Sequence, residues 1–397
     1  MHKKKLLVID YRFCLGGVGI AVSNFINNLK DDYQIDLLLM EKGGALDNRL
    51  PSDINIFYMP EAVSKYFYKS VKQFFKTEKN IFKRLKRLWY GIVGRLGFGK
   101  MLSTRIAKKY LKNFKGYDCV VNNNMDCTSH GLCGLCHTSA VYGIKAEKKL
   151  LFVHGDFVAN NYDRRYFKKE YTKYDKILSV SEGLNTQMKS LFPDYADKFE
   201  SLLNFQDVET IKTYAEQKCE VDFDKNKINL ISASRLTELK GYIRTLKVLN
   251  RLKNGGFTNF CWHILGDGEQ KADIENFIKD KELGDYVKLY GVKSNPFPYF
   301  KQADVLMLNS YHESYGLVLV ESMIAGTAVF ATRTICADEI VDCYGWVVEN
   351  SEEGIYEGLK QILENPKLIE DKNKLLKNYE YDNEGIKDKF KTIMENL

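Results

Sequence analysis

The chain has 397 residues and a net charge of +7, and 45% of its residues are hydrophobic, enough for two buried cores. Six prolines and no low-complexity tract exclude a fibrous or disordered protein. The nine cysteines are irregularly spaced, the N-terminus carries no credible export signal and no run of 18 apolar residues occurs, so we expect reduced thiols, a cytoplasmic location and no membrane-spanning helix.

The chain opens with a predicted buried parallel strand at residues 4–10 and a helix at residues 20–29. Gly16 and Gly17 lie in the turn between them, where glycine lets a ligand approach the backbone. Their spacing does not match the dinucleotide fingerprint, and a sharp turn explains them equally well. Further strands of this half are predicted at residues 35–40, 54–59, 117–122, 149–153, 176–180 and 201–203.

Most of the positive charge lies in residues 61–115, which contain 16 Lys and Arg against two acids. This segment has a net charge of +14 and leaves −7 for the rest of the chain. Aromatic and apolar residues recur in it at helical spacing, which indicates a basic amphipathic helix. Such a helix suits an anionic membrane surface, and we expect that partner. A solvated helix whose apolar face packs on the domain and a nucleic-acid partner are the alternatives.

A stretch rich in cysteine and histidine follows the strand at residues 117–122. Cys127, Cys133, Cys136 and His137 include a Cys-x-x-Cys-His motif, which occurs in haem attachment and in zinc sites. These ligands crowd into eleven residues with no second cluster elsewhere. We therefore interpret the stretch as a small-residue helix that packs on the sheet.

His154 directly follows the predicted strand at residues 149–153 and precedes a glycine. Ligands of doubly wound sheets bind beyond the carboxyl ends of the strands, so we expect His154 to face a cleft. A structural histidine is the alternative reading.

A second α/β series follows residues 206–226, a polar stretch that we interpret as a linker. Its strands are predicted at residues 228–233, 260–265, 287–290, 304–308, 328–331 and 346–348. Arg235 and Lys240 lie in the loop after the first of these strands, where ligands for an anion converge.

Glu313 and Glu321 bracket seven residues that follow the strand at 304–308. Gly316 lies between them, and the helix that begins near Leu317 offers free backbone N–H groups to an anion. The spacing does not suit an acid/base pair acting on one bond. We expect the two carboxylates to hold two parts of one extended ligand with an anion between them.

Together these motifs resemble glycosyltransferase family 4, the retaining enzymes with the GT-B fold that include the bacterial surface-polysaccharide type. The Glu-x7-Glu pair and Arg235 with Lys240 match the motifs of the family's second domain. Gly266-Asp267-Gly268 and Gly291-Val292 also fall where the family pattern expects them, and Tyr315 replaces a commoner phenylalanine. Gly16, Gly17 and His154 match the glycine loop and histidine of its first domain.

The resemblance implies a role for each of these residues. Glu313 would bond the sugar hydroxyls and steady the transition state, and His154 would contact the sugar near its reacting carbon. Glu321 would bond the ribose, and Val292 would meet the base. The diphosphate would be neutralised by the two cations and by backbone N–H groups, namely at Arg235, Lys240, Gly316 and Leu317. No metal or other cofactor is expected.

The resemblance further implies two Rossmann-like doubly wound domains facing each other across a cleft. We predict an acceptor-side domain at residues 1–205, the linker, a nucleotide-sugar domain at 227–375, and a helix at 376–397 that crosses back to the first domain.

The expected function is retaining, metal-independent transfer of a sugar, from a UDP-sugar before other donors, to a glycan or lipid-linked acceptor in bacterial polysaccharide or glycoconjugate synthesis. The expected location is peripheral at the inner face of the membrane. A nucleotide-sugar epimerase of the same fold and a non-catalytic membrane- or nucleic-acid-binding module are the alternatives.

Overall fold

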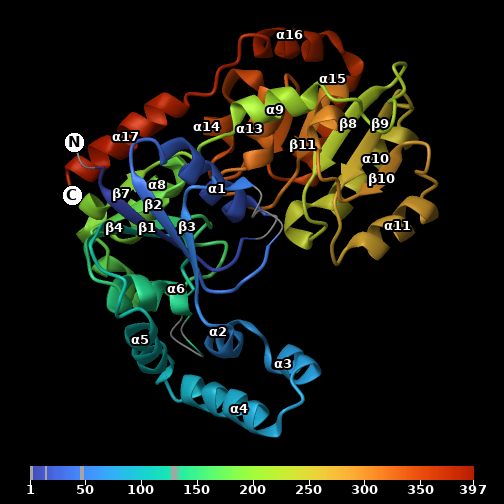
Figure 1. The fold of residues 1–397 in the computed structure, drawn as a ribbon. Coiled ribbons are helices and arrows are strands. Elements are labelled where there is room, and N and C mark those ends of the chain that lie inside the picture. The colour runs from blue at the N-terminus through green and yellow to red at the C-terminus, as the bar shows by residue number, and fades with distance from the viewer. Residues whose placement is uncertain (1–2, 14–15, 45–48, 127–131, 133) are drawn as a thin grey trace. The chain divides into compact units, whose positions relative to one another are not determined.

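The computed structural model describes residues 3–13, 16–44, 49–126, 132 and 134–397. The chain divides into two units, the first formed by Met1–Phe205 with Asn383–Leu397 and the second by Gln206–Asp382 (Figure 1). Cys127 and Cys133 of the cysteine-rich stretch lie outside the described residues.

The first unit is built on a parallel seven-stranded sheet in the order β3-β2-β1-β4-β5-β6-β7. Each strand lies within about three residues of its predicted place, because buried parallel strands are continuous apolar runs that the sequence displays directly. The strands are β1 Lys5–Asp10, β2 Gln34–Leu39, β3 Asn55–Tyr58, β4 Tyr117–Asn122, β5 Ala146–Val153, β6 Lys176–Ser179 and β7 Phe199–Ser201.

The helices of the first unit include a C-terminal helix from the far end of the chain. They are α1 Gly17–Leu29, α2 Glu61–Tyr68, α3 Val71–Thr77, α4 Ile81–Arg95, α5 Gly99–Tyr110, α6 Leu135–Thr138, α7 Arg164–Glu170, α8 Glu182–Leu191 and α17 Asn383–Glu395. The buried ring of Phe390 in α17 packs edge-on against Phe25 of α1 at 5.1 Å between ring centres. Lys391 of α17 also pairs with Asp32 at 3.1 Å, so apolar burial and charge both fix the C-terminal helix to this unit.

The second unit is built on a parallel six-stranded sheet in the order β10-β9-β8-β11-β12-β13. Its strands are β8 Ile228–Ala233, β9 Phe260–Leu265, β10 Val287–Gly291, β11 Val305–Leu308, β12 Ala328–Thr332 and β13 Gly345–Val348. Its helices are α9 Val208–Ala215, α10 Tyr242–Asn254, α11 Lys271–Asp280, α12 Phe297–Gln302, α13 Leu317–Ile324, α14 Ala337–Val341, α15 Glu352–Glu364 and α16 Lys367–Leu376.

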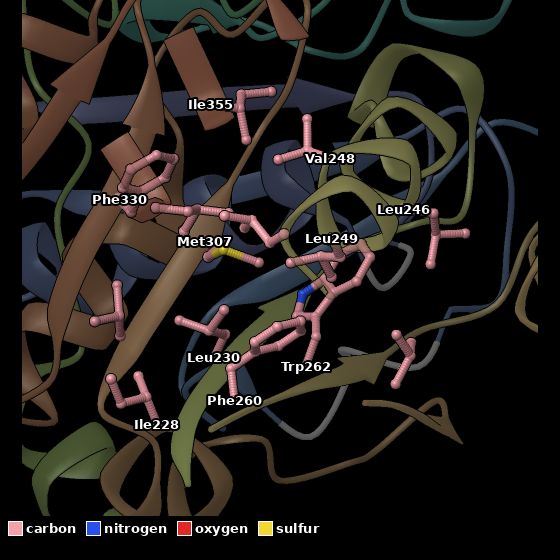
Figure 2. Packing of buried hydrophobic residues seen from close by; sticks show 14 of the residues in the cluster. Ile228, Leu230, Leu246, Val248, Leu249, Phe260, Trp262, Met307, Phe330 and Ile355 are labelled. Carbon is pink, nitrogen blue, oxygen red and sulfur yellow. The ribbon is translucent and has the colours of Figure 1, made fainter. Parts of the chain in front are cut away.

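The core of the second unit lies between the sheet and α10 and α15 (Figure 2). Trp262 is almost wholly buried there, and its indole N–H donates to Ser232 Oγ at 3.0 Å. Ser232 Oγ in turn donates to the Met307 carbonyl at 2.7 Å. This buried polar contact ties β9, β8 and β11 together without leaving an unsatisfied indole group.

Residues 206–226 belong to the second unit rather than forming a separate linker. The Phe223 N–H donates to Gln302 Oε1 at 3.2 Å. The Phe223 ring stacks on the His263 ring with 3.6 Å between the ring centres. The stretch has the polar composition of a linker, but it buries Ile211, Ala215, Cys219 and Phe223.

The basic segment 61–115 forms four helices, α2 to α5, and its apolar residues divide between two environments (Figure 1). Tyr66, Phe74 and Tyr90 form a small buried cluster, as the packing alternative predicted. In α4 and at its C-cap, however, several large apolar side chains are exposed to solvent, with Phe82 77% exposed and the C-cap residue Leu96 66% exposed. The alternative in which the whole apolar face packs on the domain is therefore wrong for α4.

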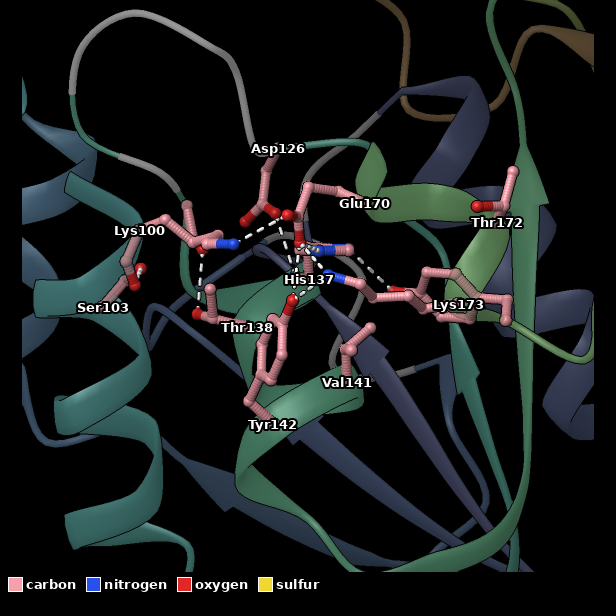
Figure 3. A network of polar contacts seen from close by, with 12 residues as sticks. Lys100, Ser103, Asp126, His137, Thr138, Val141, Tyr142, Glu170, Thr172 and Lys173 are labelled. Carbon is pink, nitrogen blue, oxygen red and sulfur yellow. Dashed lines mark hydrogen bonds and ion pairs between the residues drawn. The ribbon is translucent and has the colours of Figure 1, made fainter. Parts of the chain in front are cut away.

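A buried polar network anchors α5 to the rest of the first unit (Figure 3). The carboxylate of Glu170 at the end of α7 receives Lys100 Nζ at 2.7 Å, Lys173 Nζ at 2.9 Å and Tyr142 Oη at 2.6 Å. His137 Nε2 of α6 lies 3.6 Å from the same carboxylate. The wholly buried His137 ring also packs against the rings of Tyr142, Tyr171 and Tyr174, so packing accounts for the histidine of the cysteine-rich stretch.

Burial alone would raise the pKa of Glu170, but its bonds to His137, Lys100, Tyr142 and Lys173 outweigh burial and hold the pKa well below its ordinary value of 4.5. A carboxyl whose pKa is lower in the folded state adds stability above its unfolded pKa and loses it as the pH falls.

We expect Glu170→Gln to lower the free energy of unfolding by about 3 kcal/mol at pH 7, because it removes the charge of a buried carboxylate that Lys100, Lys173 and Tyr142 all contact. The difference between wild type and variant should shrink below about pH 4.5, the ordinary pKa of glutamate. Urea unfolding at pH 7 and pH 4 measures this. Glu200→Gln, which removes a partly exposed partner of Lys176, is the control and should cost less than about 1 kcal/mol. Equal losses in both variants, or a difference that grows in acid, would contradict this assignment.

Candidate functional site

The second sheet reverses its strand order between β8 and β11. Strand β8 is the first of this sheet in the chain, and its neighbours β9 and β11 lead the sheet in opposite directions. The loops that leave the carboxyl ends of β8 and β11 therefore separate above the sheet, which is where open α/β sheets bind ligands. These two loops carry the residues at 234–241 and 309–316.

The loop after β8 exposes Arg235 and buries Leu236. Its backbone is bonded to the next loop, since the Leu236 N–H donates to the Asp267 carbonyl at 2.9 Å. A Cβ on Gly266 would lie 2.0 Å from the Ser234 carbonyl oxygen, and one on Gly268 would lie 2.4 Å from that of Leu236. The Gly-Asp-Gly pattern therefore holds the Arg235 loop in place.

Lys240 ends a single 3-10 turn, and Gly241 follows it with φ of 70°. A Cβ on Gly241 would lie 2.1 Å from the carbonyl oxygen of Asn309 in the loop after β11. Both the left-handed backbone and this close approach require glycine. The Lys-Gly pair thus brings the lysine against the second loop.

Glu313 lies in the second loop and pairs with Lys240 through Oε1. The same oxygen accepts a hydrogen bond from Ser310 Oγ at 2.7 Å. The two charged side chains are only 14% and 23% exposed, for Glu313 and Lys240 respectively. A carboxylate is thus fixed in direction at the switch point while both charges stay within reach of a ligand.

Helix α13 begins directly after this loop. Gly316 caps it with φ of 75°, and Leu317 is its first residue. The first backbone N–H groups of a helix have no partner inside it, so this end of α13 favours an anion. Glu321 lies one turn further along α13 and is partly exposed, and Val292, which follows β10, is 65% exposed.

The first sheet reverses its order between β1 and β4. Gly16 caps α1 and Gly17 is its first residue, so both lie in the loop after β1. His154 follows β5 and lines a small pocket together with Asn123, Phe152 and Asn204. His154 Nε2 lies 3.3 Å from Asn123 Oδ1, and burial lowers the pKa of His154 to about 4. The imidazole is therefore neutral at pH 7, with one ring nitrogen donating to Asn123 and the other able to accept.

Sequence reasoning missed the side chains that hold these groups in place. Ser310 orients Glu313, and Asn123 orients His154. Asn123 directly follows a predicted buried strand, and Ser310 follows another after one residue. A polar residue at such a position is the signal that could have found them.

No group of three or more His, Cys, Asp or Glu side chains that could hold a metal ion occurs among the residues that the structure describes. In the same part of the chain, no helix combines the length and the apolar character needed to cross a bilayer.

Residues 214–381 match the family model of the glycosyl transferases group 1. This range contains the loops after β8 and β11 and all of α13, so the match covers the candidate site of the second unit.

Several curated relatives are glycosyltransferases by name. The chain is 31% identical over 205 residues to the N-acetylgalactosamine-N,N'-diacetylbacillosaminyl-diphospho-undecaprenol 4-alpha-N-acetylgalactosaminyltransferase of Campylobacter jejuni, which is 50% of this chain and 53% of that protein. It is 27% identical to the lipopolysaccharide core biosynthesis glycosyltransferase LpsE of Rhizobium meliloti over 32% of this chain and 35% of LpsE. The chain thus spans about half or less of the length of these relatives.

Solved structures resemble the chain over nearly its whole length. Anabaena HepE, solved in complex with UDP and glucose, superposes with a TM-score of 0.69 at 14% identity, covering 99% of this chain and 100% of HepE. A mutant of S. aureus TarM, in complex with Fondaparinux, alpha-GlcNAc-glycerol and UDP, gives a TM-score of 0.70 at 13% identity, with 99% and 100% covered. These similarities confirm the predicted GT-B fold class.

We expect Gly241→Ala to destabilise the second unit far more than Gly256→Ala. Gly256 also has a positive φ, of 92°, but a Cβ there meets nothing within 4 Å, so only backbone strain of about 1–2 kcal/mol applies. Gly241→Ala adds the clash with Asn309, which pushes the two loops apart. Urea unfolding of both variants measures the difference, and equal losses would show that the close approach at Gly241 is not needed.

Proposed function

We propose that the protein is a glycosyltransferase. It would move a sugar from a nucleotide-sugar donor to a glycan or lipid-linked acceptor in bacterial surface polysaccharide or glycoconjugate synthesis. The observation that carries the proposal is the Lys240–Glu313 pair beside the N-terminus of α13, at the switch point of a sheet. That site lies inside the range that matches the group 1 glycosyl transferases. We propose more specifically that the protein is an enzyme of glycosyltransferase family 4.

The proposed roles divide the donor along its length. Arg235, Lys240 and the backbone N–H groups at Gly316 and Leu317 receive the diphosphate, since each presents positive charge to the same loop region. Glu313 holds the sugar hydroxyls, Glu321 the ribose hydroxyls, and Val292 meets the base. A UDP-sugar is the first donor to test, because HepE and TarM were solved with UDP.

The proposed chemistry is transfer with retention. The bond between the anomeric carbon and the diphosphate oxygen breaks, and the acceptor hydroxyl oxygen bonds to that carbon on the same face. The hydroxyl proton passes to the departing phosphate oxygen, so the charges balance. The two cations and the helix end stabilise the diphosphate as its charge develops, a role that needs no metal ion in this proposal.

His154 is proposed to contact the sugar near its reacting carbon, with Gly16 and Gly17 leaving room for the ligand. Its lowered pKa keeps the ring neutral, so it would act by accepting a hydrogen bond and not as a cation.

The basic segment is proposed to bind an anionic membrane surface and so hold the enzyme peripherally at the inner face, where a lipid-linked acceptor is presented. Phe82, Leu85, Trp89, Ile92 and Leu96, here called the α4 face, are spaced by three or four residues and are each more than half exposed. They lie on the side of α4 opposite to the buried Arg87, Tyr90 and Gly94.

Charge favours a lipid surface over a second copy of the chain as the occupant of the α4 face. The net charge of +14 on residues 61–115 would repel a second copy, whereas it attracts anionic headgroups at about 1 kcal/mol for each cation near the surface. The Trp and Phe side chains suit the boundary between headgroups and acyl chains.

We expect Glu313→Gln to lower kcat by about 100-fold with nearly unchanged affinity for UDP, because its contact strengthens in the transition state. Glu321→Ala should weaken UDP binding by about tenfold or more and leave kcat largely intact, because it removes a charged hydrogen bond to the donor. Release of UDP from several UDP-sugars, with calorimetry for UDP binding, measures both.

If neither change affects transfer, this site is wrongly assigned. Epimerisation of the sugar without transfer would indicate the nucleotide-sugar epimerase of the same fold. Failure to bind any nucleotide sugar would indicate the non-catalytic module.

We expect the wild type to float with vesicles that contain phosphatidylglycerol and not with pure phosphatidylcholine, and salt should weaken the binding. The Phe82→Ser, Trp89→Ser double variant should lose at least about tenfold in affinity, because two large apolar side chains no longer insert. Tyr214→Ser with Leu375→Ser removes exposed apolar residues of the second unit and is the control. Absence of binding to either lipid, or equal binding by both variants, would rule out the α4 face as a membrane contact.

A further inference from the structure

Arg244 is a buried cation in an unfavourable position. It is the third residue of α10 and only 4% exposed. A positive charge in the first turn of a helix opposes the helix dipole, and burying a charge costs several kcal/mol unless it is paired. Within the described part of the second unit no ion pair joins Arg244 to a carboxylate. Natural proteins keep such locally unfavourable features mainly at functional sites.

The guanidinium of Arg244 is hydrogen-bonded to the loop that carries Glu313. Its Nε and Nη2 donate to the carbonyl oxygen of Asn309 at 3.1 and 2.6 Å. Nη2 also lies 3.4 Å from Thr332 Oγ1, and the guanidinium stacks 3.8 Å above the ring centre of Tyr311. The fork fixes the direction of one carbonyl with two charge-assisted bonds, which a lysine cannot reproduce.

From Asn309 the contacts continue to both partners of the ion pair. Thr332 Oγ1 donates to the Ser310 carbonyl at 2.6 Å, and Ser310 Oγ donates to Glu313 at 2.7 Å. On the other side, Asn309 Nδ2 donates to Thr245 Oγ1, which donates to the Gly241 carbonyl next to Lys240. A shift of the Asn309 carbonyl would therefore displace the serine that orients Glu313 and the turn that carries Lys240.

We propose that Arg244 is a positioning residue for sugar transfer, which fixes the turn at residues 309–313 so that the Glu313 carboxylate keeps its direction against Ser310 and Lys240. The inference rests on the proposed function for its catalytic consequence. Its structural part stands without it.

The test compares Arg244→Lys with Arg251→Lys in the full-length protein. Both lie on α10, and Arg251 is exposed and paired with Glu353, so it is a matched control. We expect Arg244→Lys to lower kcat by about 10- to 100-fold, the size of effect that a misplacement of about 1 Å produces, with a smaller rise in the donor KM because the turn that carries Lys240 shifts as well. Amide hydrogen exchange at residues 309–313 should quicken at least tenfold, and Arg251→Lys should change neither quantity.

Thr332→Val is a second variant, of nearly equal volume, that removes the hydroxyl bonded to the Ser310 carbonyl. We expect the same direction of change with a smaller size, which keeps the test decisive if Arg244→Lys does not fold. Exchange that quickens equally across the whole second unit would show a core role only and would overturn the inference, as would wild-type kcat and exchange in both variants. If the wild type transfers no sugar, the proposed function fails, while the local exchange still decides the positioning role.

Discussion

The pairing of Glu313 with Lys240 is the contact on which the candidate site of the second unit depends. The two residues come from loops more than 70 positions apart in sequence, and they meet only because β8 and β11 are neighbours at the point where the sheet reverses its order. An isolated surface pair of this kind would contribute little to stability. This one is held from several sides, by a serine hydroxyl on the carboxylate, by a glycine that permits close approach, and by a buried arginine behind the loop. The role of this ion pair is therefore to fix the direction of the Glu313 carboxylate, not to add stability.

Both units are built on a parallel sheet with a reversal of strand order, but they place different side chains at the strand ends. In the second unit, short loops after parallel strands carry charged groups that suit a diphosphate and sugar hydroxyls. In the first unit, the corresponding strand ends carry the neutral His154 and the amide of Asn123. Most positive charge of this unit lies instead in the four helices α2 to α5. Those helices bury some of their apolar side chains in the cluster of Tyr66, Phe74 and Tyr90, and they leave the α4 face exposed to solvent. A buried carboxylate, Glu170, anchors the last of them to the sheet's own helices.

Much of the fold could be predicted from the sequence because parallel strands are continuous apolar runs, and polar residues directly after them mark the ligand edge. Arg235, Lys240 and Glu313 were predicted in this way. Arg244 and Thr332 could not be, since their importance depends on contacts across 65 and 22 positions respectively, which no local pattern contains. The sequence contains one signal for Arg244: it lies four positions before the buried Val248, and therefore on the same face of α10. The place of residues 206–226 was misjudged because a few buried apolar residues outweigh a polar composition, and the exposure of α4 could not be told from its amphipathic pattern alone.

The central claim is that the switch point of the second sheet binds the diphosphate of a uridine nucleotide. Thermal unfolding of the full chain with UDP, GDP and ADP, each in wild type and in Lys240→Ala, tests it most directly. A nucleotide at one hundred times its Kd stabilises the folded state by about 2.7 kcal/mol. We expect UDP to raise the Tm of the wild type well above the Tm with GDP or ADP, and most of that rise to disappear in Lys240→Ala. No shift with any of the three nucleotides, or an equal shift with UDP in both proteins, would contradict it.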